Sequence, residues 1–160
     1  MNLEALKKLR AKGIKFRVIE HEPVVSIEDV ERVLKIPRGL MVKTLVFRDG
    51  DKPRFFVAAL PADRRLSWRK FSRVAGVKRD CLHLVEEGQL KELTGFDLGG
   101  IPPFGYGRHF LVILDRDLLS NSMVFCSAGL PTVSLEIQSQ SLLRLSGGKS
   151  AIICKERGKV

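Results

Sequence analysis

The chain has 160 residues, of which 44% are hydrophobic and 29% are charged, a balance typical of one folded domain and unlike a disordered tail. Its 28 lysines and arginines outnumber its 18 aspartates and glutamates and give a formal net charge of +10, which favours polyanionic partners such as nucleic acid, although lysine enrichment for solubility explains it equally well. No apolar run reaches the roughly 18 residues of a membrane span, and the N-terminus has the pattern of a helix and not of a signal peptide, so we expect a cytoplasmic protein.

The first segments predict a helix followed by a strand. Leucines recur at every third position up to Leu9, and Gly13 follows as a residue suited to end a helix. Residues 15–20 then alternate apolar and polar side chains, as a half-buried strand does. His21 lies at the end of that strand, where a histidine either lines a site or, more commonly, forms a local hydrogen bond.

The next segments predict a capped helix and a β-hairpin. Ser26 is a suitable N-cap, the apolar residues after it repeat at helical spacing and are expected to face the core, and the helix ends before Pro37. Residues 41–47 are rich in β-branched side chains, and the turn at 49–51 connects them to a second strand at 54–60.

Lys43 is unusual because it lies in the middle of an apolar strand. Period two places it on the same face as Leu45 and Phe47, which is the expected core face. Since an unpaired buried ammonium is costly, the side chain must either extend out to solvent or point into a polar cavity. The pattern leaves both possibilities open.

The remainder of the chain alternates short helices and strands, which predicts an α+β fold with a mixed sheet in a single domain, residues 1–160. The expected elements are a helix capped by Ser67, a strand at 81–85, a helix at about 86–94, strands at 110–115 and 123–126, a turn at 127–129, a strand at 132–137, a helix at about 139–145 and a final strand at 151–154. The three cysteines, Cys81, Cys126 and Cys154, lie in apolar strand-like contexts, and we expect buried thiols in a reducing compartment.

Residues 95–107 form a loop with five glycines and two prolines in thirteen residues. No helix or central strand can run through such a segment. A loop of this composition can present backbone N–H groups to a phosphate or to the oxyanion of an attacked ester, but Gly/Pro clusters also form plain connections.

The sequence lacks the motifs of several enzyme classes. It contains no phosphate-binding loop, dinucleotide fingerprint, HExxH motif or CxxC pair, and its three histidines show no metal-ligand spacing. We therefore expect no cofactor and no metal, and any catalysis should depend on positioning and backbone polarisation more than on a nucleophilic side chain.

Three ordered motifs resemble a known family. They are Met41-Val-Lys43-Thr44-Leu, then Gly95-Phe-x-x-Gly99-Gly100-Ile-x-Pro103 followed by Phe-Gly, then Ser127-Ala-Gly129 ahead of Ser134-Leu-Glu-Ile. They resemble the YbaK-like aminoacyl-tRNA deacylases, which are related to the editing domain of bacterial prolyl-tRNA synthetase. The resemblance covers about residues 21–145.

The resemblance implies a mixed, mostly antiparallel β-sheet that curls towards a barrel, with helices packed outside. It also implies a trans-editing hydrolase that cleaves the ester of mischarged aminoacyl-tRNA without a metal. Water or the neighbouring ribose hydroxyl attacks, and backbone N–H groups stabilise the oxyanion. A non-catalytic tRNA- or synthetase-binding module of the same fold, or a hydrolase of another small ester, are the alternatives. The expected partners are the tRNA acceptor end and, as a further candidate, an aminoacyl-tRNA synthetase, but neither membrane nor DNA.

Site residues follow from the resemblance by position. Lys43 corresponds to a signature lysine whose cation grips the tRNA end or the substrate carbonyl, and Gly99 and Gly100 correspond to the catalytic oxyanion loop. The implied substrate-binding residues are Ile19, His21, Thr44, Ile101, Pro102, Ser127, Gly129 and Ser134. Candidate phosphate contacts, for each of which plain solvated charge is an equal alternative, are Arg64, Arg65, Arg69, Lys70 and Arg108.

Three positions depart from the family pattern. Ser134 stands where an aspartate is frequent, Ile19 where some relatives have tyrosine, and Pro102 where serine is common. These departures bear on which amino acid is selected, because pocket polarity sets such discrimination. The whole interpretation requires the Lys43 ammonium and the peptide groups of the glycine loop to converge on one pocket.

Overall fold

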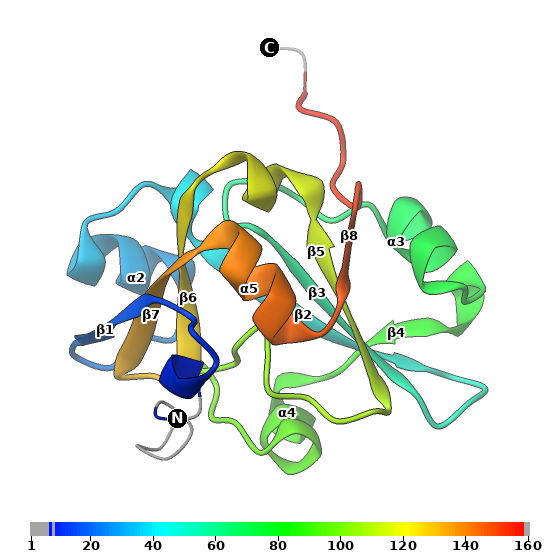
Figure 1. The fold of residues 1–160 in the computed structure, drawn as a ribbon. Coiled ribbons are helices and arrows are strands. Elements are labelled where there is room, and N and C mark those ends of the chain that lie inside the picture. Colours follow the sequence, from blue (N-terminus) through cyan, green and yellow to red (C-terminus); the bar gives the residue numbers. More distant parts are fainter. Residues whose placement is uncertain (1–6, 8, 159–160) are drawn as a thin grey trace.

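The computed structural model describes residue 7 and residues 9–158, and the helix expected at the N-terminus lies mostly outside this range. The described strands form two sheets (Figure 1). The three-stranded sheet has the order β1 (Phe16–Glu20), β7 (Val133–Gln138), β6 (Met123–Leu130). The five-stranded sheet has the order β4 (Leu82–Leu84), β2 (Val42–Asp49), β3 (Phe55–Pro61), β5 (Phe110–Asp115), β8 (Lys149–Ala151). The helices are α2 (Ile27–Leu34), α3 (Trp68–Ala75), α4 (Glu87–Thr94) and α5 (Ser139–Ser146).

The α+β fold with mostly antiparallel strands is confirmed. β2 and β3 form the predicted hairpin, while β3–β5 and β5–β8 pair in parallel and make the larger sheet mixed. Instead of one sheet that curls towards a barrel, the described strands form two sheets that remain open, joined by an isolated bridge between Met41 and Phe125.

The five-stranded sheet is buried on both faces. An inner core, which includes Val57, Leu114 and Leu135, fills the space between the two sheets and α5. An outer core, which includes Phe56 and Phe71, lies between the other face of the larger sheet and α3. The continuous apolar run of β3 fits this position, because a strand covered on both sides has no polar face.

Local sequence signals set the ends of the helices. Ser26 and Asp29 form a capping box, in which the serine Oγ accepts from the Asp29 N–H at 3.1 Å and the carboxylate accepts from the Ser26 N–H at 3.2 Å. α2 ends at Lys35 in the left-handed conformation, two residues before Pro37. α3 begins after Ser67, as predicted, and buries Phe71 in the outer core.

Two expected boundaries were wrong. β6 does not end at Cys126, because the segment 127–129 stays within the strand and its irregularity is a bulge, with Gly129 at φ +97°. β8 comes earlier than the expected final strand at 151–154. The Asp115 carboxylate accepts hydrogen bonds from the backbone N–H groups of Ile153 at 2.9 Å and Cys154 at 3.2 Å, and the segment pairs with its neighbour only through an isolated bridge between Leu66 and Cys154.

Basic side chains also hold this C-terminal segment. Lys70 Nζ donates to the Cys154 carbonyl at 3.1 Å, and the Arg64 guanidinium donates to the Lys155 carbonyl at 2.8 Å. The segment is therefore part of the folded domain through at least Lys155. None of the described helices combines the length and the apolar character needed to cross a membrane.

We predict that Asp115→Ala lowers the free energy of unfolding by about 2–4 kcal/mol, because it removes charge-assisted hydrogen bonds and leaves two buried N–H groups without an acceptor. Urea denaturation measures this change. Asp80→Ala, at an exposed position, is the control and should change the value by less than about 0.5 kcal/mol. Equal denaturation midpoints for the two variants would contradict the role given to Asp115.

Candidate active site

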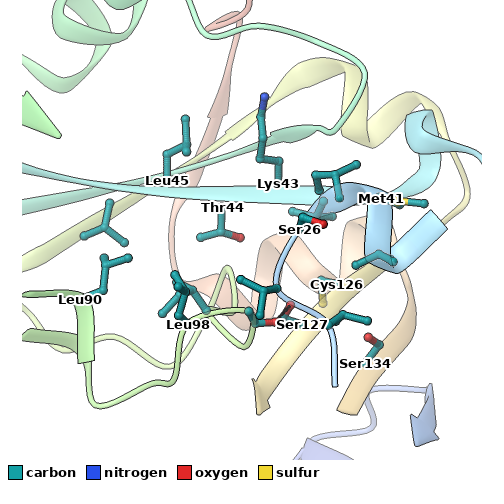
Figure 2. A pocket seen from close by; sticks show the side chains of 18 of the residues that line it. Ser26, Met41, Lys43, Thr44, Leu45, Leu90, Leu98, Cys126, Ser127 and Ser134 are labelled. Atoms are coloured by element: carbon teal, nitrogen blue, oxygen red, sulfur yellow. Dashed lines mark hydrogen bonds between the residues drawn. The ribbon is translucent and has the colours of Figure 1, made fainter. Parts of the chain in front are cut away.

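A cavity of about 310 Å³ lies where β2 meets the outer side of the β6–β7 pair, and Figure 2 shows its lining. The remaining walls come from α2, from α4 and from the glycine loop. Its lining is mainly apolar, with hydroxyl-bearing residues Ser26, Thr44, Ser127 and Ser134. A concave apolar site with few polar groups is the usual form of a small-ligand pocket.

The apolar stripe of α2 lines this cavity. Ile27, Val30 and Leu34 were expected to face the core, yet none of them is fully buried and all three form part of the cavity wall. Sequence analysis therefore missed α2 as a site element. A helix pattern alone could not reveal this, because an apolar stripe looks the same whether it covers a core or a cavity.

Lys43 contributes to the cavity lining, but β2 separates its ammonium from the cavity. Thr44 points towards the cavity, while the side chain of Lys43 leaves the strand on the opposite side with Leu45 (Figure 2). The Lys43 ammonium donates a hydrogen bond of 3.0 Å to the Arg64 carbonyl, and burial lowers its pKa from the ordinary value. Of the two possibilities that the pattern left open, the ammonium thus reaches a backbone carbonyl beyond the sheet and not the cavity.

The glycine loop reaches the cavity through a tight turn. The Gly100 N–H donates to the Asp97 carbonyl at 2.9 Å, and Gly99 has φ +85°, which together indicate a type II turn with glycine at its third position. Gly99 and Ile101 line the cavity. The N–H of Gly99 has no hydrogen-bond partner among the described residues.

Both glycines also pack against neighbouring backbone. A Cβ on Gly99 would lie 2.1 Å from the Val24 carbonyl oxygen, and a Cβ on Gly100 would lie 2.7 Å from backbone atoms of Leu130. Gly100 faces Leu130, and its N–H is already used within the turn. The expected convergence is therefore only half observed, because Gly99 borders the cavity whereas the Lys43 ammonium does not.

Two serines face each other across β6 and β7. Ser127 and Ser134 are register partners, and both line the cavity. Ser127 Oγ donates to the Gly99 carbonyl at 3.2 Å, which ties the glycine turn to β6. Ser134 Oγ lies 2.8 Å from His21 Nε2, and the other ring nitrogen of His21 lies 2.8 Å from the Glu22 carbonyl. His21 thus forms the local hydrogen bond expected of it and also contacts a cavity residue.

Four predicted substrate-binding residues do not line the cavity, and one of them, His21, contacts it only through Ser134. Ile19 is the register partner of Ser134 on β1 and lies beside it in the sheet. Pro102 is buried, and its carbonyl accepts a hydrogen bond of 2.8 Å from the Tyr106 hydroxyl. Gly129 occupies the bulge of β6.

The predicted phosphate contacts divide into two groups. Arg64 is largely buried, contacts Asp117 and, like Lys70, donates to a carbonyl of the C-terminal segment, so both are structural here. The side chains of Arg65, Arg69 and Arg108 are exposed and remain available to a ligand.

The cysteines do not supply a nucleophile to the cavity. Burial raises the pKa of the Cys126 thiol to about 12 and, together with Asp115, that of Cys154 to about 12. Cys81 is only partly buried, in contrast to the prediction, and its Sγ donates to Asp51. Within the described part of the chain no group of His, Cys, Asp or Glu side chains is arranged to hold a metal ion.

Comparison with known proteins gives consistent matches. The aminoacyl-tRNA editing domain model matches residues 21–145. A protein of Enterococcus faecalis, EbsC, named as a candidate Cys-tRNA(Pro)/Cys-tRNA(Cys) deacylase, is 29% identical over 93% of this chain and 97% of its own length. The multifunctional Ser/Thr-tRNA deacylase ProXp-y of Escherichia coli is 26% identical over 86% of this chain and 83% of its own. The crystal structure of APE2540 superposes with a TM-score of 0.84 at 24% identity, covering 95% of this chain and 99% of that one, and supports the fold.

We predict that Gly99→Ala destabilises the fold by about 2–4 kcal/mol, because the new methyl group would overlap the Val24 carbonyl and alanine disfavours a positive φ. Thermal and urea unfolding measure this. Gly88→Ala in α4 is the matched control, since nothing lies within 4 Å of its added Cβ; its stability should be unchanged or higher by at most about 1 kcal/mol. A Gly99→Ala protein as stable as the control would show that the turn does not need glycine.

Proposed function

The chain belongs to the aminoacyl-tRNA editing domain family, and from that premise we propose that it is a trans-editing hydrolase that cleaves the ester of mischarged aminoacyl-tRNA. The observation that carries the proposal is where the cavity lies. All of its lining residues fall between Val24 and Ser134, inside the matched segment, so the pocket is built entirely by the part of the chain that defines the family.

The cavity suits an aminoacyl ester whose amino acid has an apolar side chain. An apolar side chain of a mischarged amino acid can pack against α2 and β2, where Val30, Leu34 and Val46 contribute to the lining. Specificity among small side chains in such a pocket is modest, about 10- to 200-fold per methylene. The few hydroxyl groups would then fix the orientation of the ester.

We assign oxyanion stabilisation to the N–H of Gly99. Gly99 borders the cavity and its N–H lacks a protein partner among the described residues, whereas the N–H of Gly100 is used within the turn. A positioned donor of this kind contributes about 3–4 kcal/mol to transition-state stabilisation. Gly100 then acts by closing the turn that aims Gly99. Ser127, which holds the Gly99 carbonyl, keeps the same peptide segment in place.

Attack on the ester needs no side-chain nucleophile in this proposal. The ester is already activated, and a water molecule, oriented by the neighbouring ribose hydroxyl of the substrate or acting alone, can attack its carbonyl carbon; the ribose oxygen of the ester then leaves with a proton from that water, and the amino acid is released as a free carboxylic acid. The Thr44 hydroxyl points into the cavity (Figure 2) and can orient that nucleophile. The reaction proposed here is metal-independent.

In this proposal the Lys43 ammonium contacts the end of the tRNA and not the carbonyl of the ester. Its ammonium lies beyond β2, in the electrostatic environment of Asp63 and Arg65. Exposed Arg65, Arg69 and Arg108 are proposed as further phosphate contacts, since a guanidinium binds phosphate well. Association with an aminoacyl-tRNA synthetase remains a prediction.

We predict that the purified protein hydrolyses at least one member of a panel of tRNAs carrying alanine, serine, cysteine or proline. Release of labelled amino acid under single-turnover conditions measures the reaction. Adding a metal chelator should not change the rate at which the protein hydrolyses that aminoacyl-tRNA. Saturable binding to the panel without hydrolysis of any member would contradict the enzyme and support a tRNA-binding module.

We predict that Lys43→Ala raises KM for that substrate severalfold with a smaller change in kcat, because loss of a phosphate contact weakens tRNA binding more than chemistry. The slope of log affinity against log salt should also fall by nearly one unit. Lys52→Ala, in the exposed hairpin turn, is the control and should leave both quantities unchanged. A selective loss of kcat in Lys43→Ala would instead place the ammonium at the ester.

A further inference from the structure

The hydroxyl groups of Ser127 and Ser134 both donate hydrogen bonds to other groups of the protein. Ser127 Oγ lies 3.2 Å from the Gly99 carbonyl, which can only accept, so the Ser127 proton points at that oxygen. Such an arrangement leaves the lone pairs of the Ser127 oxygen free.

His21 fixes the direction of the second proton. Its Nδ1 lies 2.8 Å from the Glu22 carbonyl, again a pure acceptor, so Nδ1 carries a hydrogen, and in that tautomer Nε2 holds a lone pair. Nε2 lies 2.8 Å from Ser134 Oγ, and the serine must therefore donate to the imidazole. Ser134 is 6% exposed, so few other orientations are open to its hydroxyl.

The two oxygens consequently form a pair of hydrogen-bond acceptors on one wall of the cavity. As register partners on neighbouring strands their Cβ atoms lie about 4.5–5.5 Å apart, a spacing that one donor group can bridge. A positively charged donor gains most from such a pair, because charge-assisted hydrogen bonds are about twice as strong as neutral ones.

The charges of the cavity agree with a cationic ligand group. Its lining contains one acidic residue, Glu87, and one basic residue, Lys43. The Lys43 ammonium is directed away to the Arg64 carbonyl. No lining cation therefore competes for the serine oxygens.

We propose that the Ser127–Ser134 pair binds the α-ammonium group of the aminoacyl ester, and that His21 is a positioning residue that keeps Ser134 an acceptor. This inference rests on the proposed function. The side chain of the amino acid is then directed towards the apolar wall formed by α2, and the ester towards Gly99, which adjoins Ser127.

Binding of stable substrate analogues tests the proposal without relying on turnover. The probes are adenosines carrying alanine or lactic acid through a 3′-amide, which have nearly the same shape and differ in an ammonium or a hydroxyl at the α-carbon. Titration calorimetry with the wild-type protein should show about 10- to 100-fold tighter binding of the alanyl analogue. Binding of the two analogues within about twofold would overturn the proposal.

Substitutions of the two serines and of His21 identify the residues that cause the preference for the alanyl analogue. Ser127→Ala combined with Ser134→Ala should reduce the ratio of the two affinities to near one, whereas Ser141→Ala, at a buried serine of α5 outside the cavity lining, should retain it. His21→Ala should lower the ratio while binding of the lactyl analogue is unchanged or improved, because the freed Ser134 hydroxyl can then donate. A simple loss of structure would weaken both analogues together. A double variant that folds and keeps the wild-type ratio would overturn the assignment to these serines.

The outcomes separate this inference from the proposed function. A clear preference for the alanyl analogue in a protein that hydrolyses no aminoacyl-tRNA would support the ammonium site and contradict the hydrolase. Hydrolysis of a panel member by a protein that binds both analogues equally would support the hydrolase and contradict the ammonium site.

Discussion

The alternation of side chains along β2 is the constraint on which the arrangement of the site depends. This strand lies within a sheet that is covered on both faces, by α3 on one side and by the inner core and the cavity on the other. Successive residues therefore enter different layers. Thr44 reaches the cavity and Lys43 cannot, although only one peptide bond separates them. A shift of one residue in the β2–β3 register would exchange their positions and bury an ammonium in the cavity.

The glycine turn follows from close backbone packing as much as from chemistry. Gly99 touches the Val24 carbonyl and Gly100 touches the backbone of Leu130, so the loop lies between two chain segments that a side chain would push apart. This packing holds Gly99, whose N–H has no hydrogen-bond partner among the described residues, at the cavity wall. The same substitutions that would alter catalysis are thus expected to alter stability, and the two effects have to be measured separately.

The sequence was informative where a signal is local and uninformative where the outcome depends on which layer covers a face. The N-cap at Ser26, the β2–β3 hairpin and the absence of a helix or central strand in residues 95–107 depend on local residues, and all were predicted. The face of Lys43 was also predicted correctly, through period two. What covers that face depends on α3 and on the two-sheet arrangement, and the residues of the strand itself indicate neither of them. Likewise, the residues of α2 show that the helix is amphipathic and do not show that it borders a cavity.

Ser134 illustrates how one departure from the family pattern changes the electrostatics of a site. A carboxylate at this position would lie beside His21 and favour a proton on Nε2, which would give an ion pair within the protein. Serine is uncharged, forms no ion pair with the imidazole and leaves an uncharged acceptor facing the cavity. A neutral acceptor attracts an ammonium less strongly than a carboxylate does, but it also avoids a buried charge when the site is empty. The apolar wall must then contribute more of the binding free energy, so the shape of the amino-acid side chain should govern which ester is held long enough to react.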